Sequence, residues 1–527
     1  MAMNEHRTGG GRLQPLCAPL LRMPPFPGGQ PRGGPVYRER ACGTEDIASA
    51  TIIADQLVRT RVGGAFWRSA TDGSRARKAR ATSSADTMTG HDPWLRIEKG
   101  VPIAATIADE IAWLAAAADC PVVHSVTGEA LDRTALLSEL HRHIVQFDYL
   151  DPWTGTPITI ARWIEILGEW RALLDQNREI VATYGIAAWK RPVIAQFLWS
   201  GGPRSHGRTS FSKLPAGSSV AVWPSRVTPA RRHGMRAAGH HILQIEDGFL
   251  RSAGLGVSLN PPFSIVVDRC GIYYDPSTPS DLEKILCEAE LGPELCARAA
   301  RLIAFLNQHR ITKYNAGAPQ ADTLPAHRRK VLVPGQVADD RSVALGRADV
   351  GETIDLLSRV RAAEPDAFIV YKPHPDVVAG LRRGHVETDK VLRYADQIIS
   401  NVSLDSLLAQ VDAVHVLSSL TGFEALLRGC EVVTHGHPFY AGWGLTRDLA
   451  PPIERRGRQL TLEQLAAAVL ILYPRYLDPV TRLPCPPEVL AERLATGQRE
   501  RPGFLQRLRH IQGQISLTGR RFAEHRQ

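Results

Sequence analysis

Two stretches in the C-terminal half of the chain place anion-binding side chains where apolar runs end. Residues 369–377, IVYKPHPDV, change from apolar to cationic, and residues 414–427, VHVLSSLTGFEALL, change from apolar to hydroxyl-bearing. The side chains that could bind a phosphate there are Lys372, His374, Ser418, Ser419 and Thr421. In open α/β sheets, ligands bind at the carboxyl ends of the strands, and helix N-termini there attract phosphate. We therefore expect the two stretches to form one nucleotide-phosphate site.

Three further residues at strand ends are expected to bind the same nucleotide. Pro375, with the proline two residues before it, restricts the loop that carries His374. Glu424 lies in the first turn of the expected helix, where it can accept ribose hydroxyls or complete a capping box. Gln336 ends another apolar run, KVLVPG. The structural alternative is a proline-rich turn with exposed cations beside ordinary helix N-caps, which use the same geometry as phosphate ligands.

A pair of adjacent carboxylates, Glu246 and Asp247, ends the apolar run in HHILQIEDGFLRSAGLG. Buried charges are costly unless paired or used, and the structural alternative is a pair satisfied by Arg251 and loop amides. Beside a nucleotide site, a carboxylate can act as nucleophile or base in an attack at an anomeric carbon. Since side chains alternate along a strand, one of the two points into the cleft. We expect it to be Asp247, because Gly248 beside it allows a substrate to approach closely.

Two other motifs carry residues that could line a cleft. ITKYN supplies Lys313 and Asn315. PFYAGWG supplies Tyr440 and Trp443, which suit a sugar-stacking wall or a lid as well as simple packing. Arg251 and these four residues are the expected acceptor or cleft residues.

Metal and ATP chemistry are not expected. Asp339 and Asp340 resemble a metal-binding pair only loosely, because no third ligand lies near them in the sequence. The chain has no GxxxxGK[ST] motif, which argues against kinase-like ATP use.

Composition narrows the class of protein. A chain of 527 residues can form two or three domains. The net charge of +9 suits an anionic partner, with solvated basic tails as the alternative. Eight cysteines without a CxxC pair argue against a zinc ribbon and a disulfide scaffold. Because no apolar run is long enough for a bilayer span or a signal peptide, we expect a cytoplasmic protein.

The residue pattern divides the chain into five segments. Strands that alternate with helices predict parallel sheets with helical crossovers, so the expected class is α/β. The segments are 1–95, disordered or added by a start codon placed too far upstream; 96–190, helical; 191–320, a first Rossmann-like domain with acceptor and catalytic residues; 328–480, a second Rossmann-like domain with the nucleotide site; and 481–527, a helical, basic tail.

One short motif occurs twice, as YLDPWT at 149–154 and as YLDPVT at 476–481. Each copy follows a helical stretch, which favours a repeat unit over chance. On this interpretation the segment 96–190 is the remnant of a preceding module.

Eight ordered motifs, from about 190 to 480, resemble the KpsC-type capsule β-Kdo transferases of the bacterial capsular polysaccharide synthesis and export group. They are EDGFLRSAGLG, GIYYDPSTPSDLEKIL, ITKYN, VLVPGQVADD, VYKPHPDVVAGLRRG, HVLSSLTGFEALLRG, HPFYAGWGLTRD and LYPRYLDP. The resemblance implies a GT-B fold, in which two Rossmann-like domains face each other across a cleft. It implies CMP-Kdo as donor substrate and no cofactor or metal. It also implies a transfer of β-Kdo, with retention, to a poly-Kdo glycolipid linker on lyso-phosphatidylglycerol.

The resemblance also implies residue roles. His374 and Pro375 match the family's HP motif at the CMP phosphate, and Ser418 and Ser419 match its hydroxyl-rich partner. Asp247 matches the carboxylate proposed to attack the Kdo anomeric carbon. The family usually carries two catalytic modules in tandem, whereas this chain carries one, which is more similar to the C-terminal module.

We therefore expect a retaining glycosyltransferase of capsule polysaccharide biosynthesis and transport, cytoplasmic and peripheral on the inner face of the inner membrane. Its expected partners are CMP-Kdo, the lipid-linked Kdo acceptor and other capsule synthesis and export proteins, and not nucleic acid. The alternative is a non-catalytic capsule-assembly module that binds the Kdo linker or a partner protein. A weaker alternative is a GT-B epimerase that accepts a UDP-sugar.

Overall fold

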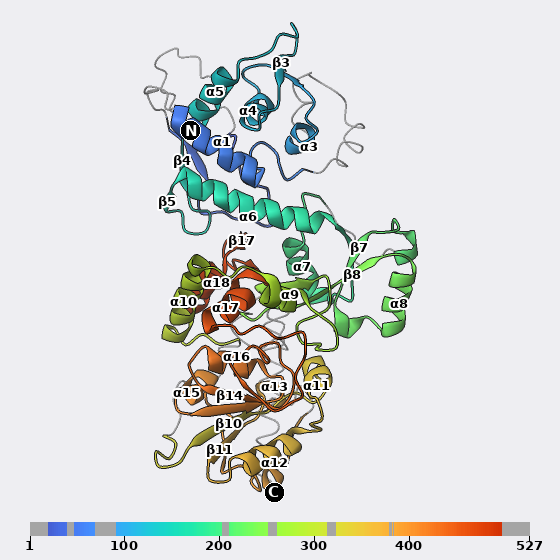
Figure 1. Cartoon of the computed structure of the whole chain (residues 1–527), viewed down its shortest axis with the longest axis vertical. Coiled ribbons are helices and arrows are strands. Elements are labelled where there is room, and N and C mark those ends of the chain that lie inside the picture. Colours follow the sequence, from blue (N-terminus) through green and yellow to red (C-terminus); the bar gives the residue numbers. More distant parts are fainter. Residues whose placement is uncertain are drawn as a thin grey trace, which may run out of the picture. The chain divides into compact units, whose positions relative to one another are not determined.

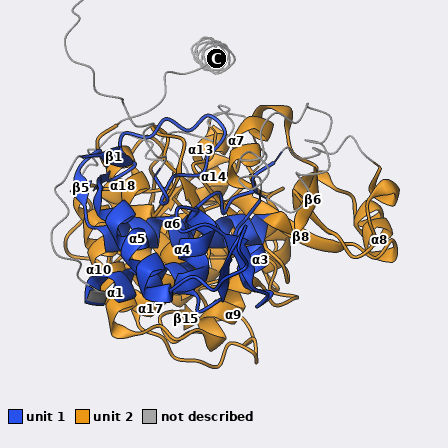
Figure 2. Cartoon of the chain, turned by 90° about the horizontal axis from the view of Figure 1, so that it is seen from above, with its two compact units in different colours: residues 1–177, 200–202 blue, residues 178–199, 203–527 orange. Residues whose placement is uncertain are grey.

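The computed structural model describes residues 19–38, 47–68, 91–202, 210–250, 261–313, 323–378, 382 and 384–497. Arg251 and Asn315, two of the expected cleft residues, lie outside these ranges. The chain forms two compact units, shown in different colours in Figure 2. Unit 1 comprises residues 1–177 and 200–202, and unit 2 comprises residues 178–199 and 203–527.

Unit 1 contains helices and two small sheets. Its helices are α1 (Ile47–Thr60), α3 (Trp94–Ile97), α4 (Glu110–Ala117), α5 (Arg133–Val145) and α6 (Ile160–Arg178). Its strands are β1 (Pro35–Tyr37), β2 (Ile103–Ala105), β3 (Val122–His124), β4 (Phe147–Leu150) and β5 (Pro157–Ile158). β4 lies between β1 and β5 in an antiparallel sheet, and β2 pairs in parallel with β3. Trp153 and Trp163 pack edge-on against Trp170 in its core.

The expectation of disorder over residues 1–95 is wrong for the part that the structure describes. Helix α1 buries Ala50, Ile53, Ala54 and Leu57. These four residues follow the three-and-four spacing of an amphipathic helix. The surrounding residues are rich in Gly, Pro and Arg, a composition typical of disorder, and it masks this short helical periodicity.

The two YLDP motifs adopt the same local structure. Each ends a strand that pairs antiparallel with the strand after the turn, β4 with β5 and β16 (Arg475–Leu477) with β17 (Pro484–Cys485), in the same register. The aspartate of each motif, Asp151 or Asp478, accepts hydrogen bonds from the backbone N–H groups two and three residues further on. The tyrosine hydroxyl of each, Tyr149 or Tyr476, donates to a carbonyl of the preceding helical stretch. The sequence repeat is therefore also a repeat of local structure.

The first sheet of unit 2 has the strand order β17-β16-β9-β8-β7-β6. Its further strands are β6 (Ile180–Tyr184), β7 (Ser219–Val222), β8 (His241–Asp247) and β9 (Ser264–Asp268). β6, β7 and β8 are parallel, whereas β9 runs antiparallel to both β8 and β16. The helices that accompany this sheet in sequence are α7 (Arg191–Phe197), α8 (Pro229–Ala237), α9 (Asp281–Glu288) and α10 (Pro293–Gln308).

The second sheet of unit 2 is entirely parallel, in the order β12-β11-β10-β13-β14-β15. Figure 1 labels its strands β10, β11 and β14. Its strands are β10 (Lys330–Pro334), β11 (Phe368–Lys372), β12 (Gln397–Ile398), β13 (Ala413–Val416), β14 (Glu431–Thr434) and β15 (Arg447–Asp448). Its helices are α11 (Arg341–Gly346), α12 (Thr353–Ala363), α13 (Pro375–Val378), α14 (Thr388–Val391), α15 (Leu404–Leu408) and α16 (Leu420–Leu426). Central strands such as β13 are buried along their whole length, as expected of a parallel sheet covered on both faces.

The chain returns to the first sheet after the second is complete. α17 (Leu462–Ala466) continues as a π-helical stretch, Ala467–Leu472, and is followed by β16, β17 and α18 (Pro487–Ala495). The expected range 328–480 for the second domain is therefore too long, because β16 pairs with β9 of the first sheet. The expected start at 191 is too late, because β6 already pairs with β7.

One hydrophobic core joins elements of both sheets in unit 2, with Leu302 of α10, Leu332 of β10, Phe423 of α16 and Leu465 of α17 among its members. Among the described residues, none of the helices has the length and apolar character that a bilayer crossing requires.

Candidate functional site

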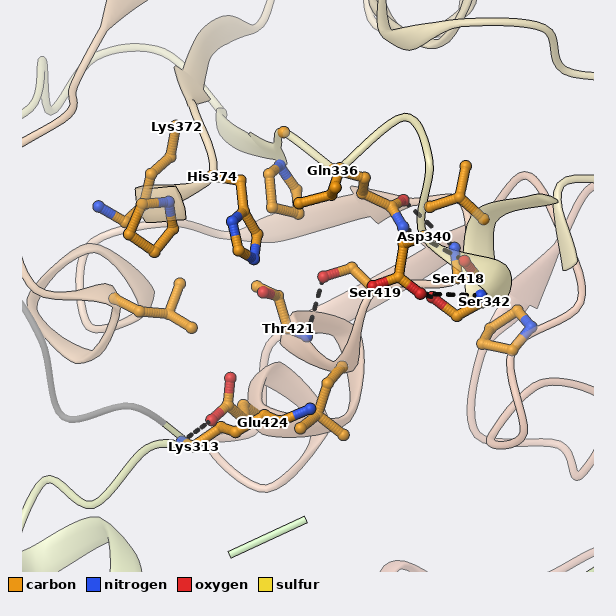
Figure 3. A pocket seen from close by; sticks show the side chains of 18 of the residues that line it. Lys313, Gln336, Asp340, Ser342, Lys372, His374, Ser418, Ser419, Thr421 and Glu424 are labelled. Atoms are coloured by element: carbon orange, nitrogen blue, oxygen red, sulfur yellow. Dashed lines mark hydrogen bonds between the residues drawn. The ribbon is translucent and has the colours of Figure 1, made fainter. Parts of the chain in front are cut away.

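A cavity of about 210 Å³ lies in unit 2 at the carboxyl ends of β10, β11 and β13. Its lining includes every residue predicted to bind the donor: Gln336, Lys372, His374, Pro375, Ser418, Ser419, Thr421 and Glu424. Lys313, one of the predicted cleft residues, also lines it, and Figure 3 shows most of this set around one space. The placement follows from the sheet, since β10 pairs in parallel with both β11 and β13 and their ends therefore meet at one edge.

Gln336 connects two sides of the cavity. Its Oε1 accepts hydrogen bonds from the backbone N–H groups of Leu417 and Ser418, both at 3.3 Å, and its Nε2 donates to Ser418 Oγ at 3.2 Å. The loop after β10 is thereby fastened to the loop after β13. Gln336 orients Ser418, which is a more structural role than the direct donor contact expected from the sequence.

The hydroxyls at the start of α16 have different roles. Ser419 is the N-cap, and its Oγ accepts from the backbone N–H of Thr421 at 3.2 Å. Ser418 and Thr421 also line the cavity. The prediction that one hydroxyl is a cap is confirmed for Ser419.

Lys372 and His374 lie opposite these hydroxyls (Figure 3). Lys372 Nζ donates to the carbonyl of Val402 at 2.6 Å, and burial lowers the pKa of Lys372 to about 8. His374 Nδ1 accepts from the backbone N–H of Asp376 at 3.1 Å. Burial, followed by the field of Lys313, lowers the pKa of His374 to about 4. His374 is therefore neutral at pH 7, and the Nδ1 acceptor leaves its proton on Nε2, so the ring is a neutral donor.

Glu424 fixes the position of Lys313. Its Oε1 accepts from the backbone N–H of Lys313 at 2.7 Å, which ties the segment after α10 to α16. Burial is the main cause that raises the pKa of Glu424. One carboxylate oxygen is thus used by the fold.

The predicted catalytic pair ends β8 and is not part of the lining of this cavity. Asp247 Oδ1 accepts from Lys190 Nζ at 2.8 Å, and both side chains are mostly buried. Lys190 Nζ also lies 3.7 Å from the centroid of the Trp223 ring. Glu246 Oε1 accepts from the backbone N–H of Asp247 at 3.1 Å.

Both members of the pair act electrostatically on the cavity lining, because the charges of Glu246 and, to a lesser extent, Asp247 contribute to the raised pKa of Tyr273. Burial, and then the charge of Asp247, raise the pKa of Glu246 to about 7, while Lys190 and Lys313 oppose the shift. In turn, the charge of Glu246 contributes to the raised pKa of Tyr274, which lines the cavity. The two adjacent carboxylates thus have different environments. Asp247 is paired with a lysine, whereas the pKa of Glu246 is raised to about 7.

Lys190 was not predicted from the sequence. It lies in YGIAAWKRP, where a lysine among apolar residues has the appearance of an ordinary surface cation. One signal could have identified it: the sequence has no Asp or Glu between Glu179 and Glu246. The first acidic residues C-terminal to Lys190 are therefore the carboxylate pair at the end of β8.

Of the two alternatives for Tyr440 and Trp443, simple packing is confirmed, and a sugar-stacking wall or a lid is not. Both side chains are fully buried. The hydroxyl of Tyr440 donates to the carbonyl of Ser419, and Trp443 Nε1 donates to the carbonyl of Phe439 at 2.9 Å. Their role is packing beneath the cavity, because the glycines around them allow the loop to fold inward. Tyr273, Tyr274 and Phe439 line the cavity instead.

Asp339 and Asp340 have separate partners. Asp339 Oδ1 lies 3.3 Å from Arg382 Nη2, and Asp340 caps α11 by accepting from the backbone N–H of Ser342 at 2.9 Å. Within the described part of the chain, no three His, Cys, Asp or Glu side chains come close enough together to hold a metal ion.

Residues 218–476 match the family model described as capsule polysaccharide biosynthesis protein. The chain is 41% identical over 340 residues to the capsule polysaccharide modification protein LipA of Neisseria meningitidis serogroup A, a match that covers 63% of this chain and 48% of LipA. It is 36% identical over 319 residues to the lipopolysaccharide-processing protein LpsZ of Rhizobium meliloti, which covers 58% of this chain and 72% of LpsZ. The chain thus spans about half the length of LipA.

Two solved structures are similar to this chain in sequence and fold. The β Kdo 2,4 transferase of Thermosulfurimonas dismutans KpsC superposes with a TM-score of 0.54 at 35% identity, over 60% of this chain and 98% of that chain. The β Kdo 2,7 transferase of the same KpsC superposes with a TM-score of 0.50 at 32% identity, over 61% and 100% of the two chains.

Proposed function

The chain belongs to the capsule polysaccharide biosynthesis family, as a KpsC-type protein, and from this premise we propose that it is a glycosyltransferase that moves Kdo from CMP-Kdo to a Kdo-terminated glycolipid. The acceptor would be the poly-Kdo linker of a capsule polysaccharide, and the fold would be a GT-B fold whose two sheets both lie in unit 2. The observation that carries the proposal is the cavity at the strand ends of the second sheet, whose lining residues Tyr273 and Tyr274 are within the field of the carboxylate Glu246 at the end of β8.

The cavity suits the CMP half of the donor. A phosphate between the β11 loop and the start of α16 would meet the cation of Lys372, the N–H of neutral His374 and the hydroxyls of Ser418 and Thr421. Hydrogen bonds to an ionised acceptor are stronger than those between neutral groups. Stabilising the leaving phosphate in this way supplies much of what a transfer from an activated donor requires.

The carboxylate pair suits the sugar half. In the first step, an Asp247 oxygen forms a bond to the anomeric carbon of Kdo while the bond from that carbon to the CMP phosphate oxygen breaks, and CMP leaves with the electron pair. In the second step, the acceptor hydroxyl attacks the same carbon, its proton passes to Glu246, and Asp247 is released. Two inversions give retention of configuration.

Lys190 keeps Asp247 ionised and oriented for the first step, because its ammonium lies 2.8 Å from Oδ1. The raised pKa of Glu246 suits the second step, since a base that titrates near the operating pH is the most effective. One pair of carboxylates thereby supplies a nucleophile and a base.

The test is transfer by the full-length protein from CMP-Kdo to a synthetic Kdo-terminated glycoside, read by mass spectrometry. The proposal expects an acceptor mass increase of one Kdo together with release of CMP. A folded protein that binds CMP or the acceptor without any transfer would instead indicate a capsule-assembly module. Turnover of a UDP-sugar without an acceptor would indicate an epimerase.

A further inference from the structure

One segment of unit 2 carries positive charge without any acidic residue. Between Glu179 and Glu246 the sequence has nine Lys and Arg residues and no Asp or Glu. Since the net charge of the whole chain is +9, the remainder is balanced. From residue 180 to residue 267, the acidic residues are Glu246 and Asp247, the proposed catalytic pair. The stretch of sequence that leads to this pair is therefore strongly basic.

Five of the seven described cations of this segment lie on α8 or in the two short helical turns that precede it in sequence, and α8 packs against β8 (Figure 1). We define the α8 basic surface as Lys213, Arg226, Arg231, Arg232 and Arg236. All but the half-buried Arg232 are exposed, and within the described residues the structure gives none of the five an ion pair. An arrangement of like charges without counter-charges raises the local concentration of anions.

Two interactions connect this surface to neighbouring parts of unit 2. The guanidinium of Arg231 lies 5.2 Å from the centroid of the Tyr184 ring, which holds its flat face and leaves its edge N–H groups available. Burial, and then the charges of Arg341 and Arg236, lower the pKa of Arg232, while Tyr274 and Asp275 oppose the shift. Tyr274 lines the donor cavity. One member of the α8 basic surface is thus within the field of a residue that lines the cavity.

We propose that the α8 basic surface binds the carboxylates of the acidic oligosaccharide acceptor and guides its end to the transfer site. This inference rests on the proposed function, because Kdo is a sugar acid and each residue of the acceptor carries a carboxylate. Four of the five cations are arginines, whose planar guanidinium pairs with a carboxylate through two parallel hydrogen bonds.

The composition of the surface favours a glycan over a lipid bilayer. Helices that lie in a bilayer interface carry large apolar residues on the face opposite their cations. The one large apolar side chain of α8 that could enter a bilayer is Met235, and it is fully buried. In addition, no large hydrophobic residue between 210 and 245 is exposed in this described stretch.

The test compares two matched double variants of the full-length protein, Arg226→Gln/Arg236→Gln on the α8 basic surface and Arg301→Gln/Arg393→Gln elsewhere in unit 2. All four arginines are exposed, so each variant removes two solvated charges. The probe is a fluorescent Kdo disaccharide, and its carboxyl methyl ester is the neutral control. Binding is measured by fluorescence anisotropy, and acceptor KM by the transfer assay.

The proposal expects the α8 variant to raise the dissociation constant and the acceptor KM about tenfold or more, a change of about 1.4 kcal/mol. The control variant should stay close to the unsubstituted protein, and the methyl ester should bind both variants equally. CMP affinity should be unchanged in both. Higher salt should reduce the difference, because exposed charges are screened.

Equal affinity of the two variants for the disaccharide would overturn the proposal. Loss of binding to phosphatidylglycerol-containing vesicles by the α8 variant, with disaccharide affinity unchanged, would also overturn it and assign the surface to a membrane. If the unsubstituted protein shows no transfer while the binding difference persists, the proposed function fails and the acceptor surface stands.

Discussion

Lys190 Nζ lies 2.8 Å from Asp247 Oδ1 and 3.7 Å from the centroid of the Trp223 ring. The lysine is thus held between a carboxylate and the face of an aromatic ring, and its side chain is 10% exposed. A mostly buried ion pair of this kind keeps its carboxylate ionised, while an unpaired carboxylate at the same place would become neutral. Lys190 is therefore a positioning residue for the proposed nucleophile.

We predict that Lys190→Met lowers the rate of transfer by about a hundredfold, the order of effect expected for loss of one charge that supports a nucleophile. Because Lys190 also opposes the raised pKa of Glu246, its loss should move the pH–rate profile to higher pH. Lys190→Arg should recover part of the rate, since it restores the cation. The measurement is the pH dependence of kcat for the three proteins, and an unchanged profile in Lys190→Met would contradict the role.

The raised pKa of Glu246 predicts an acidic limb in the rate of transfer. Glu246 must be ionised to accept the acceptor's proton, so the rate should fall as the pH decreases through about 7. Glu246→Gln should be slow and should lack this limb. A full acidic limb in the variant would show that another group titrates.

The same shift affects stability. The native carboxyl keeps its proton up to a pH of about 7, whereas in the unfolded chain it releases it near its ordinary pKa of 4.5. The native state therefore binds more protons between these values, and stability falls as the pH rises through them. In Glu246→Gln the decrease of the melting temperature between pH 5 and pH 8 should be smaller than in the unsubstituted protein.

His374 is expected to bind the CMP phosphate as a neutral donor. His374→Ala should weaken CMP binding about tenfold to a hundredfold, as the loss of a hydrogen bond to a charged group would. His374→Gln should lose less, because its side chain keeps an N–H. His385, which is exposed in the same sheet domain, is the matched control. The measurement is the CMP affinity by isothermal titration calorimetry. Equal affinities for His374→Ala and His385→Ala would show that His374 does not bind CMP.

Substitution of Trp443 tests whether this residue packs in the core or contacts the sugar. Because its side chain is fully buried, Trp443→Ala should lower the free energy of unfolding by about 3–5 kcal/mol. Leu449→Ala, at a side chain that is half exposed, should have a small effect. Denaturant unfolding measures both. If Trp443→Ala raised the acceptor KM without loss of stability, the buried position would be contradicted.

The donor cavity could be predicted from the sequence because each of its parts is a local signal. A strand end followed by Lys372 and His374, and another followed by Ser418 and Ser419, must meet at one edge if the strands are parallel neighbours. Parallel pairing of the strands is enough to bring these ends together, and no contact with distant residues has to be known. The same reasoning placed Glu246 and Asp247 at the end of β8.

What could not be predicted depends on contacts distant in sequence. Lys190 and Asp247 are separated by 57 residues, and no local pattern links them. The assignment of β16 to the first sheet depends on its pairing with β9, far earlier in the chain. Tyr440 and Trp443 lie between glycines that suggest an exposed loop, and only the packing of the core shows that both point inward.

Asp247 provides the most direct test of the central claim, because the proposed chemistry requires it while the proposed CMP site does not. The measurement is the mass of the acceptor after incubation with CMP-Kdo, together with CMP affinity, for Asp247→Asn and for the control Asp339→Asn. The account predicts that Asp247→Asn loses transfer and keeps CMP affinity, while Asp339→Asn keeps both. Transfer by Asp247→Asn at the unsubstituted rate would contradict it.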